Sequence, residues 1–451
     1  MEINVIDDKL IKKRILSMIV PITAENILQM TASVVAMAMV SRISQVAVGA
    51  IGIATIIIRI IWSLLKGLAT GNSVFVAQSY GAKDYNKLWN SSIQALIIIL
   101  GLSIFFQQVL YINAQYLLQI FNPSPLLLVE GTRYLKILSF SLPFTGVILF
   151  TAGLLQGMGN AKIPMVIIFI LNLVNIFFSY TLIFGKLGFK GYGLTGAAWA
   201  YNISYVVGGF LSFYTLFNKD SIFKKTMAYR DKKFTMKGSM ELVKFAIPTS
   251  FEMSFWQFAS IIITRAVLTY GETAYAAYQL GLQAEAISFM PAAGFGIAAS
   301  TFIGQAIGGR DRPLARKYFY HLVKISILVT SFAAILLLVF PKIIMRALSG
   351  DLDVISIGAV YLFVMGLVQI PQNLAGLING ALRGAGHPRE AMLTVGIGLW
   401  LVRIPLVLLL TYTFKANLYW IWIVMGFDLV VRFFLSLYVL KKKDIFNKSL
   451  G

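Results

Sequence analysis

Long apolar runs separated by short polar stretches recur along the whole chain of 451 residues. Each run has about 20 residues, which is enough for a helix to cross the hydrocarbon core of a bilayer. Because backbone groups in hydrocarbon have no water to bond, spans of this length are expected to be helices. The pattern predicts twelve transmembrane helices, centred roughly on residues 28, 64, 101, 146, 174, 206, 257, 290, 331, 369, 402 and 429.

Composition and charge support a multi-pass protein of the cell (inner or plasma) membrane. The chain is 58% apolar and 13% charged, whereas soluble domains have about a quarter of their residues charged. Its 39 Lys and Arg against 18 Asp and Glu fall mostly in alternate loops, which predicts both termini in the cytoplasm. This loop bias accounts for the net charge of +21, so we expect the bilayer as partner and no nucleic acid. We expect a monomer.

Motifs in the first half return in the second half 227 residues later. "VAQSYGAKD" (76–84) matches "IGQAIGGRD" (303–311), and "LLQGMGNAKIPM" (154–165) matches "ALRGAGHPREAM" (381–392). The pair Pro21 and Glu25 returns as Pro248 and Glu252. In the first of these motifs, we read the glycines as left-handed residues that end long helices.

The repeat predicts an all-α protein with two six-helix lobes, residues 1–217 and 239–451, joined by a basic cytoplasmic linker, residues 218–238. Six spans is an even number, so both lobes enter the membrane in the same sense. Such parallel repeats are related by an axis along the membrane normal, with the cargo site between them near the midplane. Glu25 and Glu252 would then lie at matching depths.

Three carboxylates fall inside predicted spans: Glu25, Glu252 and Glu285. An ionisable group at such depth costs at least ~2.5 kcal/mol on insertion scales, so it is expected to face the bundle interior and to have a partner or a function. Each acid either bonds neighbouring helices or carries the coupling proton or cation. Glu252 and Glu285 have fewer basic residues nearby in sequence than Glu25, so we rank Glu252 first and Glu285 second as coupling groups.

Several cations also lie inside spans. Asp428 and Arg432 are spaced i, i+4, so we expect a structural pair, and we expect Arg403 to have an acid partner as well. Lys66 and Arg59 lie on one helix. They could supply a fixed positive charge that replaces a mobile cation or attracts an anionic cargo, or they could snorkel or pair with an acid.

No catalytic or nucleotide-binding cluster is evident, so we expect no enzyme activity and no cofactor. The chain lacks a Gly-x-x-x-x-Gly-Lys-Ser/Thr loop. It has no cysteine, and its two histidines, His321 and His387, are far apart in sequence. We expect no resident metal.

The motifs resemble those of the multidrug and toxic compound extrusion family over nearly the whole chain, from about residue 15 to 440. The similarity rests on the two motif pairs above, on residues 172–200 and on "AYAAYQLGLQAEAISFMP" (274–291). It implies two six-helix lobes that open alternately to either side of the membrane, driven by Na⁺ or H⁺. The implied function is an antiporter that exports small amphipathic organic compounds. The alternative is a flippase for a lipid-linked saccharide or lipid precursor.

The chain departs from the family pattern where many relatives have two acids in the N-terminal lobe. Asn172 and Asn175 match the family positions, but Ala36 and Ser179 replace the acids. We therefore predict no cation bound between the first and fifth spans. A glutamate that another subgroup has in the seventh span is replaced here by Trp256.

Overall fold

The structure is a computed structural model that describes residues 8–188, 190–218, 221–226 and 236–446. All of the regular structure in these residues is helical. The N-terminal half contains α1 (Asp8–Ser41), α2 (Gln45–Gly81), α3 (Tyr85–Gln119), α4 (Pro125–Ser139), α5 (Leu142–Gly157), α6 (Lys162–Phe184), α7 (Gly193–Phe217) and the short α8 (Ile222–Thr226).

The C-terminal half contains α9 (Met236–Leu268), α10 (Glu272–Gly308), α11 (Arg312–Val339), α12 (Pro341–Leu348), α13 (Leu352–Gly384), α14 (Pro388–Gly396), α15 (Ile404–Leu408) and α16 (Leu418–Lys443). Two π-helical segments, Ile397–Arg403 and Leu409–Thr413, continue α14 and α15. Residues 388–413 therefore form one irregular span.

The predicted spans correspond to helices throughout the described chain. Nine helices are long and apolar enough to cross a membrane there, or ten if the pair α4 and α5, bent by 49°, counts as one span. The remaining predicted centres, 206 and 257, lie in α7 and α9, helices of 25 and 33 residues. The polytopic all-helical fold is confirmed, and the count of twelve spans stays a prediction.

The repeat is visible in local geometry. Asp84 caps α3 by accepting the Lys87 N–H at 2.9 Å, and Asp311 caps α11 by accepting the Leu314 N–H at the same distance. The residue before each cap is left-handed, with φ of 57° at Lys83 and 58° at Arg310. The prediction that the motif glycines are the left-handed residues was wrong. In each turn the backbone N–H of the cap aspartate donates to the carbonyl oxygen five residues earlier. This bond places the left-handed residue directly before the cap.

Glycines at matching positions allow close helix packing in both halves. A Cβ on Gly153 of α5 would come closer than 3.0 Å to the carbonyl oxygen of Ala69 in α2. A Cβ on Gly380 of α13 would meet the carbonyl oxygen of Gly296 in α10 in the same way. These two contacts are 227 residues apart on both sides, so the repeat extends from sequence to packing.

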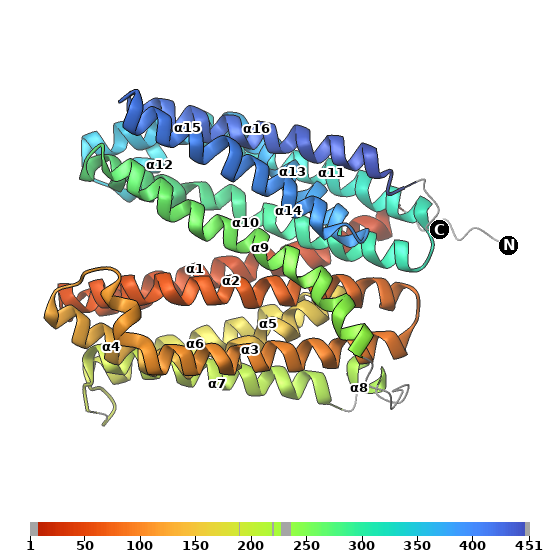
Figure 1. Cartoon of the computed structure of the whole chain (residues 1–451), viewed down its shortest axis with the longest axis horizontal. Helices are drawn as coiled ribbons and strands as arrows, with labels where there is room; N and C mark the ends of the chain where they lie inside the picture. Colours follow the sequence, from red (N-terminus) through yellow and green to blue (C-terminus); the bar gives the residue numbers. More distant parts are fainter. Residues whose placement is uncertain (1–7, 189, 219–220, 227–235, 447–451) are drawn as a thin grey trace. The chain divides into compact units, whose positions relative to one another are not determined.

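The chain divides into two compact units. We call residues 24–79 and 84–250 the N unit, and residues 1–23, 80–83 and 251–451 the C unit. Within the N unit, α6 packs on α7, and α3 packs on α4 and α5. Within the C unit, α13 packs on α10, α11 and α16, which are coloured from green to dark blue in Figure 1.

The unit boundaries give the repeated proline and glutamate a structural meaning. One boundary falls within α1 between Thr23 and Ala24, and the other within α9 between Ser250 and Phe251. Each boundary lies two residues after the proline inside the helix, Pro21 or Pro248, and just before the glutamate of the repeated pair. A proline removes one helix hydrogen bond, so each helix is weakened where it passes from one unit into the other. The predicted lobes, 1–217 and 239–451, and the linker, 218–238, stay predictions.

Candidate functional site

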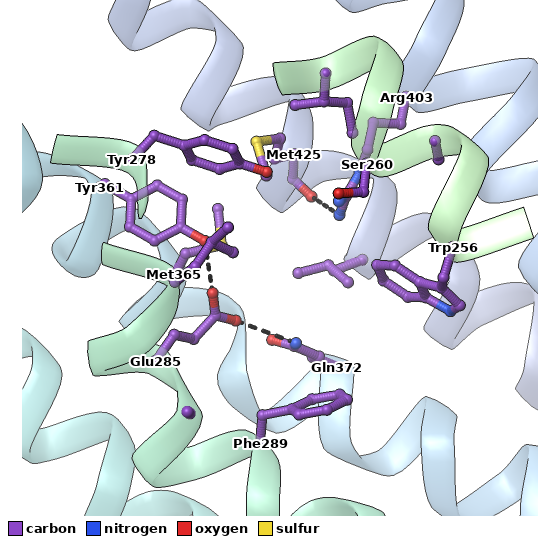
Figure 2. A pocket seen from close by; sticks show the side chains of 15 residues that line it. Trp256, Ser260, Tyr278, Glu285, Phe289, Tyr361, Met365, Gln372, Arg403 and Met425 are labelled. Carbon is purple, nitrogen blue, oxygen red and sulfur yellow. Dashed lines mark hydrogen bonds between the residues drawn. The ribbon is translucent and has the colours of Figure 1, made fainter. Parts of the chain in front are cut away.

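A cavity of about 230 Å³ opens between helices of the C unit. Figure 2 shows its polar groups at separate places on a largely apolar wall, with Glu285 near Gln372 and Tyr361, and Arg403 near Ser260 and Met425. The wall includes Trp256, Ile263, Leu282, Phe289 and Met365. An apolar cavity with a few convergent polar groups is the usual form of a small-molecule site.

Glu285 is buried at the cavity and bonded by neutral donors. One carboxylate oxygen accepts the Tyr361 hydroxyl at 2.6 Å, and the other accepts the Gln372 amide at 3.2 Å and the Gln369 amide at 3.4 Å. Within the described chain Glu285 forms no salt bridge. The amide oxygens of both glutamines are buried and have no hydrogen-bond partner in the described chain.

This geometry satisfies both charge states of Glu285. As a carboxylate it accepts three hydrogen bonds. As a carboxylic acid it could donate its proton to an amide oxygen of Gln369 or Gln372, once that amide turns over. The carboxyl group of Glu285 itself is then hydrogen-bonded in either charge state.

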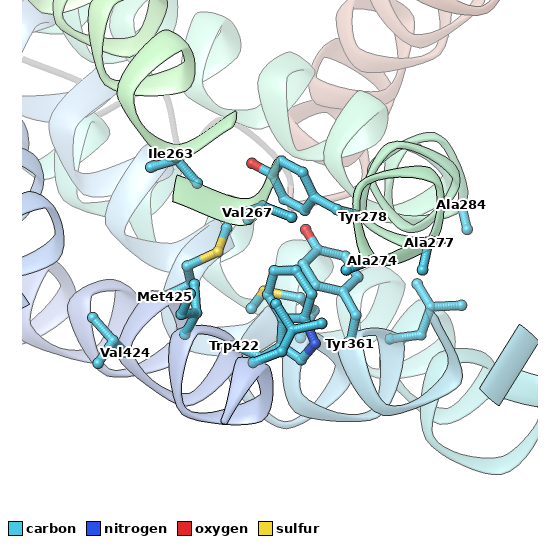
Figure 3. Close-up of a cluster of buried hydrophobic side chains, with 14 of the residues drawn as sticks. Ile263, Val267, Ala274, Ala277, Tyr278, Ala284, Tyr361, Trp422, Val424 and Met425 are labelled. Atoms are coloured by element: carbon cyan, nitrogen blue, oxygen red, sulfur yellow. The ribbon is translucent and has the colours of Figure 1, made fainter. Parts of the chain in front are cut away.

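A stack of aromatic rings holds Tyr361 in place. Figure 3 shows Tyr278, Tyr361 and Trp422 together in the buried core of the C unit. Tyr278 stacks on Trp422 with ring centroids 5.5 Å apart, and Tyr361 meets Trp422 edge-on at 5.1 Å. Such pairs favour defined ring orientations, so the hydroxyl that bonds Glu285 has a fixed direction.

Arg403, on another part of the wall, belongs to a buried cluster of charges. Its Nε donates to Asp428 at 2.7 Å and its Nη2 donates to the Met425 carbonyl at 3.1 Å. Arg432 also donates to Asp428 from its Nε at 2.8 Å and from its Nη2. The expected Asp428–Arg432 pair is confirmed, and Arg403 shares that acid. One carboxylate between two guanidinium groups leaves the cluster positive.

Trp256 lies against this cluster. Its ring centroid is 4.6 Å from the guanidinium carbon of Arg432 and 5.6 Å from that of Arg403. Cations are attracted to the face of an indole ring. The position that carries an acid in some relatives therefore carries an aromatic ring that stacks with two cations here.

Glu252 has a basic partner that sequence reasoning missed. Its Oε1 accepts a hydrogen bond from Nη1 of Arg383 at 2.6 Å, and both side chains are buried. Few basic residues lie near Glu252 in sequence, but Arg383, 131 residues away in sequence, bonds it in the structure. The repeat contained a signal for this pair, because Arg383 matches the neutral Gln156 of the first half and is therefore a charge that the repeat itself does not require. The ranking of Glu252 as the first coupling candidate stays a prediction.

Glu25, the counterpart of Glu252, has a different setting in the N unit. It is 7% exposed, and its Oε2 has no hydrogen-bond partner in the described residues. Lys66, half-buried on α2, interacts with it electrostatically. The ammonium of Lys66 also lies 6.0 Å from the ring centroid of Trp62. Arg59 is exposed.

The two family asparagines are buried on α6. Asn175 donates to the Ser204 hydroxyl of α7 at 3.4 Å, and Ser179 is buried one turn further along. Leu28 of α1 packs beside Leu171, next to Asn172. In the described chain no group of three His, Cys, Asp or Glu side chains could hold a metal ion. The predicted lack of a cation site between α1 and α6 stays a prediction.

The fold and these features define a class: a polytopic helical membrane protein with an internal sequence repeat and with ionisable groups buried inside its helices. The MatE family model matches residues 21–181 and 248–409. These two matches cover the two halves of the repeat and most of the chain. The chain therefore belongs to the MatE family, a family of membrane transporters.

Relatives and solved structures agree with this assignment. The chain is 28% identical over 436 residues to a probable multidrug resistance protein NorM from Thermotoga maritima, covering 95% of this chain and 91% of that protein. It is 24% identical to a probable multidrug resistance protein YoeA from Bacillus subtilis, covering 95% and 94%. A solved MOP superfamily transporter from Pyrococcus furiosus shares the fold at a TM-score of 0.87 and 18% identity, covering 97% of each chain.

Proposed function

We propose that this protein is an ion-coupled antiporter that exports amphipathic organic compounds across the cell membrane by alternating access. H⁺ or Na⁺ would supply the driving force. The family assignment and the relatives described as multidrug resistance proteins support export. The observation that carries ion coupling is Glu285, a buried acid at an apolar cavity whose hydrogen-bond donors are all neutral.

The proposed cycle assigns the coupling charge to Glu285 and not to Glu252. Antiport needs a group whose charge differs between the two conformations. Glu252 forms a buried ion pair with the guanidinium of Arg383 at 2.6 Å, so it already has a fixed charged partner. Glu285 has no such partner in the described chain, so binding or loss of an ion there can alternate with binding of a cargo in the same cavity.

Efflux from proteoliposomes, with the pH gradient and the Na⁺ gradient imposed separately, tests this proposal. Glu285→Gln keeps the size of the side chain and one acceptor oxygen but removes its titration. We expect gradient-driven efflux to fall at least about tenfold, which corresponds to ~1.4 kcal/mol, while cargo binding stays within a few-fold. The gradient that drives wild-type efflux identifies the ion.

Glu272 supplies the matched control. It lies in the first turn of the same helix, α10, is exposed, and does not line the cavity. Glu272→Gln should leave efflux unchanged. Wild-type efflux from Glu285→Gln at matched expression would remove Glu285 as the coupling group.

A further inference from the structure

A second cavity, of about 590 Å³, lies where α11 begins. The loop that joins α9 to α10 is at the other end of α10 and α11. It is lined by the first turns of α11, by the start of α1 and by Phe446, which follows α16. All of these residues belong to the C unit. The alternation of basic loops predicts that this end faces the cytoplasm.

The cavity carries an excess of positive charge. Arg312, Arg316 and Lys317 line it, and none of their side chains forms an ion pair or a hydrogen bond with another described residue. The acid on its wall, Asp8, is already engaged, because its Oδ1 lies 3.2 Å from Nε2 of His321. Cations gathered on one wall repel one another, so the arrangement costs free energy unless an anion is bound.

The internal repeat shows that this charge is not required by the fold. The positions of the N half that match Arg312, Arg316 and Lys317 carry the neutral residues Tyr85, Trp89 and Asn90. Trp89 is buried, and its ring lies 4.6 Å from that of Phe223 in α8. In the N half, an aromatic pair therefore packs at this position, whereas in the C half the matching position lines a cavity with cations.

The chemistry of the wall favours a phosphate. Guanidinium groups form paired, charge-assisted hydrogen bonds to phosphate oxygens, and an ammonium adds a point charge. Tyr320, which is 61% exposed, and Phe446 supply aromatic rings beside the cations. Basic pockets at the cytoplasmic ends of transmembrane helices suit anionic lipid headgroups, and aromatic rings are enriched at that depth of the membrane.

We propose that the cavity formed by Arg312, Arg316, Lys317 and Tyr320 is a binding site for a phosphate-bearing anion. The anion is the headgroup of an anionic phospholipid or a soluble phosphate compound. Because His321 and Asp8 tie the first turn of α1 to the same wall, a bound anion would rest against the helix that carries Pro21 and Glu25. The site is separate from the cavity at Glu285 and does not depend on the transport cycle.

Native mass spectrometry of the purified full chain tests the site without relying on transport. The probes are phosphatidylglycerol, phosphatidylcholine as the neutral comparison, and inorganic phosphate as competitor. The wild type should retain phosphatidylglycerol in preference to phosphatidylcholine. The triple variant Arg312→Gln, Arg316→Gln, Lys317→Gln should bind phosphatidylglycerol at least about tenfold more weakly, since each cation near an anionic headgroup contributes to affinity.

Two further variants make the result specific. Lys83→Gln, Lys162→Gln, Lys441→Gln removes three exposed cations outside the cavity and should keep wild-type retention. Arg316→Trp installs the residue that the N half has at this position and should lower retention even if the triple variant does not fold. Displacement by inorganic phosphate would identify a soluble phosphate as the ligand, and no displacement would identify the lipid. Equal retention of phosphatidylglycerol by the wild type and by both cavity variants would overturn the proposal.

Discussion

The ionisable residues inside the spans differ in their partners more than in their type. Glu252 bonds a guanidinium, Glu285 bonds a phenol and two amides, and Glu25 has one unpartnered oxygen near a lysine of the same unit. A buried carboxylate held by a fixed cation stays charged, whereas one held by neutral donors can change its charge. This difference in partners is the basis on which we propose Glu285, and not Glu252, as the coupling acid.

At this scale we predict that Glu252 and Arg383 are needed for stability as a pair. Arg383→Gln leaves a buried carboxylate without its cation, and Glu252→Gln leaves a buried guanidinium without its anion. Each single variant should lose roughly 3 kcal/mol or more of stability, because an unpaired buried charge is strongly destabilising. Thermal unfolding of the purified protein measures the loss.

The double variant Glu252→Gln, Arg383→Gln provides the control. With both charges removed, stability should recover most of what either single change loses. A Glu252→Gln protein with wild-type stability but no gradient-driven efflux would contradict the structural role, and would return Glu252 to the first place among the coupling candidates.

At the scale of elements, close helix packing depends on glycines that the repeat places in both halves. α13 approaches α10 so closely at Gly380 that a side chain there would meet a backbone carbonyl oxygen, which cannot move aside as a flexible side chain would. The same holds for α5 against α2 at Gly153. The helix pair α10 and α13 also carries Glu285, Tyr361 and Gln372, so its spacing sets the geometry of the cavity.

We predict that Gly380→Ala lowers stability by about 1–3 kcal/mol, the usual cost of inserting atoms into a well-packed core. It should also reduce cargo binding, because α13 must shift away from α10. Gly376→Ala, on the same helix, adds the same methyl group where nothing lies within 4 Å. Thermal unfolding and cargo binding of the two variants should differ, and equal behaviour would show that the close approach is not limiting.

At the scale of the whole molecule, the two halves share a fold but not a charge pattern. The N half has Ala36 and Ser179 where many relatives are expected to have acids, and neutral residues opposite the basic cavity of the C half. The C half holds Glu252, Glu285 and Asp428 together with their partners. Ion coupling is therefore expected in the C unit.

We predict that no Na⁺ binds between α1 and α6 in the N unit. The contribution of Asn172 and Asn175 to thermal stability should be the same in Na⁺ and in K⁺. The reason is that their amide oxygens provide no formal charge to balance a bound cation. The measurement compares the wild type with Asn175→Ala in each salt. Stabilisation by Na⁺ that disappears in Asn175→Ala would refute this, whereas stabilisation that disappears only in Glu285→Gln would place the ion in the C unit.

The sequence by itself determined the membrane class, the helical fold and the repeat. These follow from the length and spacing of apolar runs and from a constant offset between motifs, which can be read directly along the chain. The same local information placed the Asp428–Arg432 pair, because an i, i+4 spacing puts two side chains on one helix face.

Only the tertiary structure decided which partners each buried acid has. Glu252 bonds Arg383, which is 131 residues away in sequence, and Glu285 bonds Tyr361 and Gln372. All three partners lie on α13. These partners are set by how α9, α10 and α13 pack, and sequence distance carries no information about contacts between separate helices. The electrostatic role of a buried side chain depends on the atoms within a few ångströms of it, and those atoms are known only once the helices are packed.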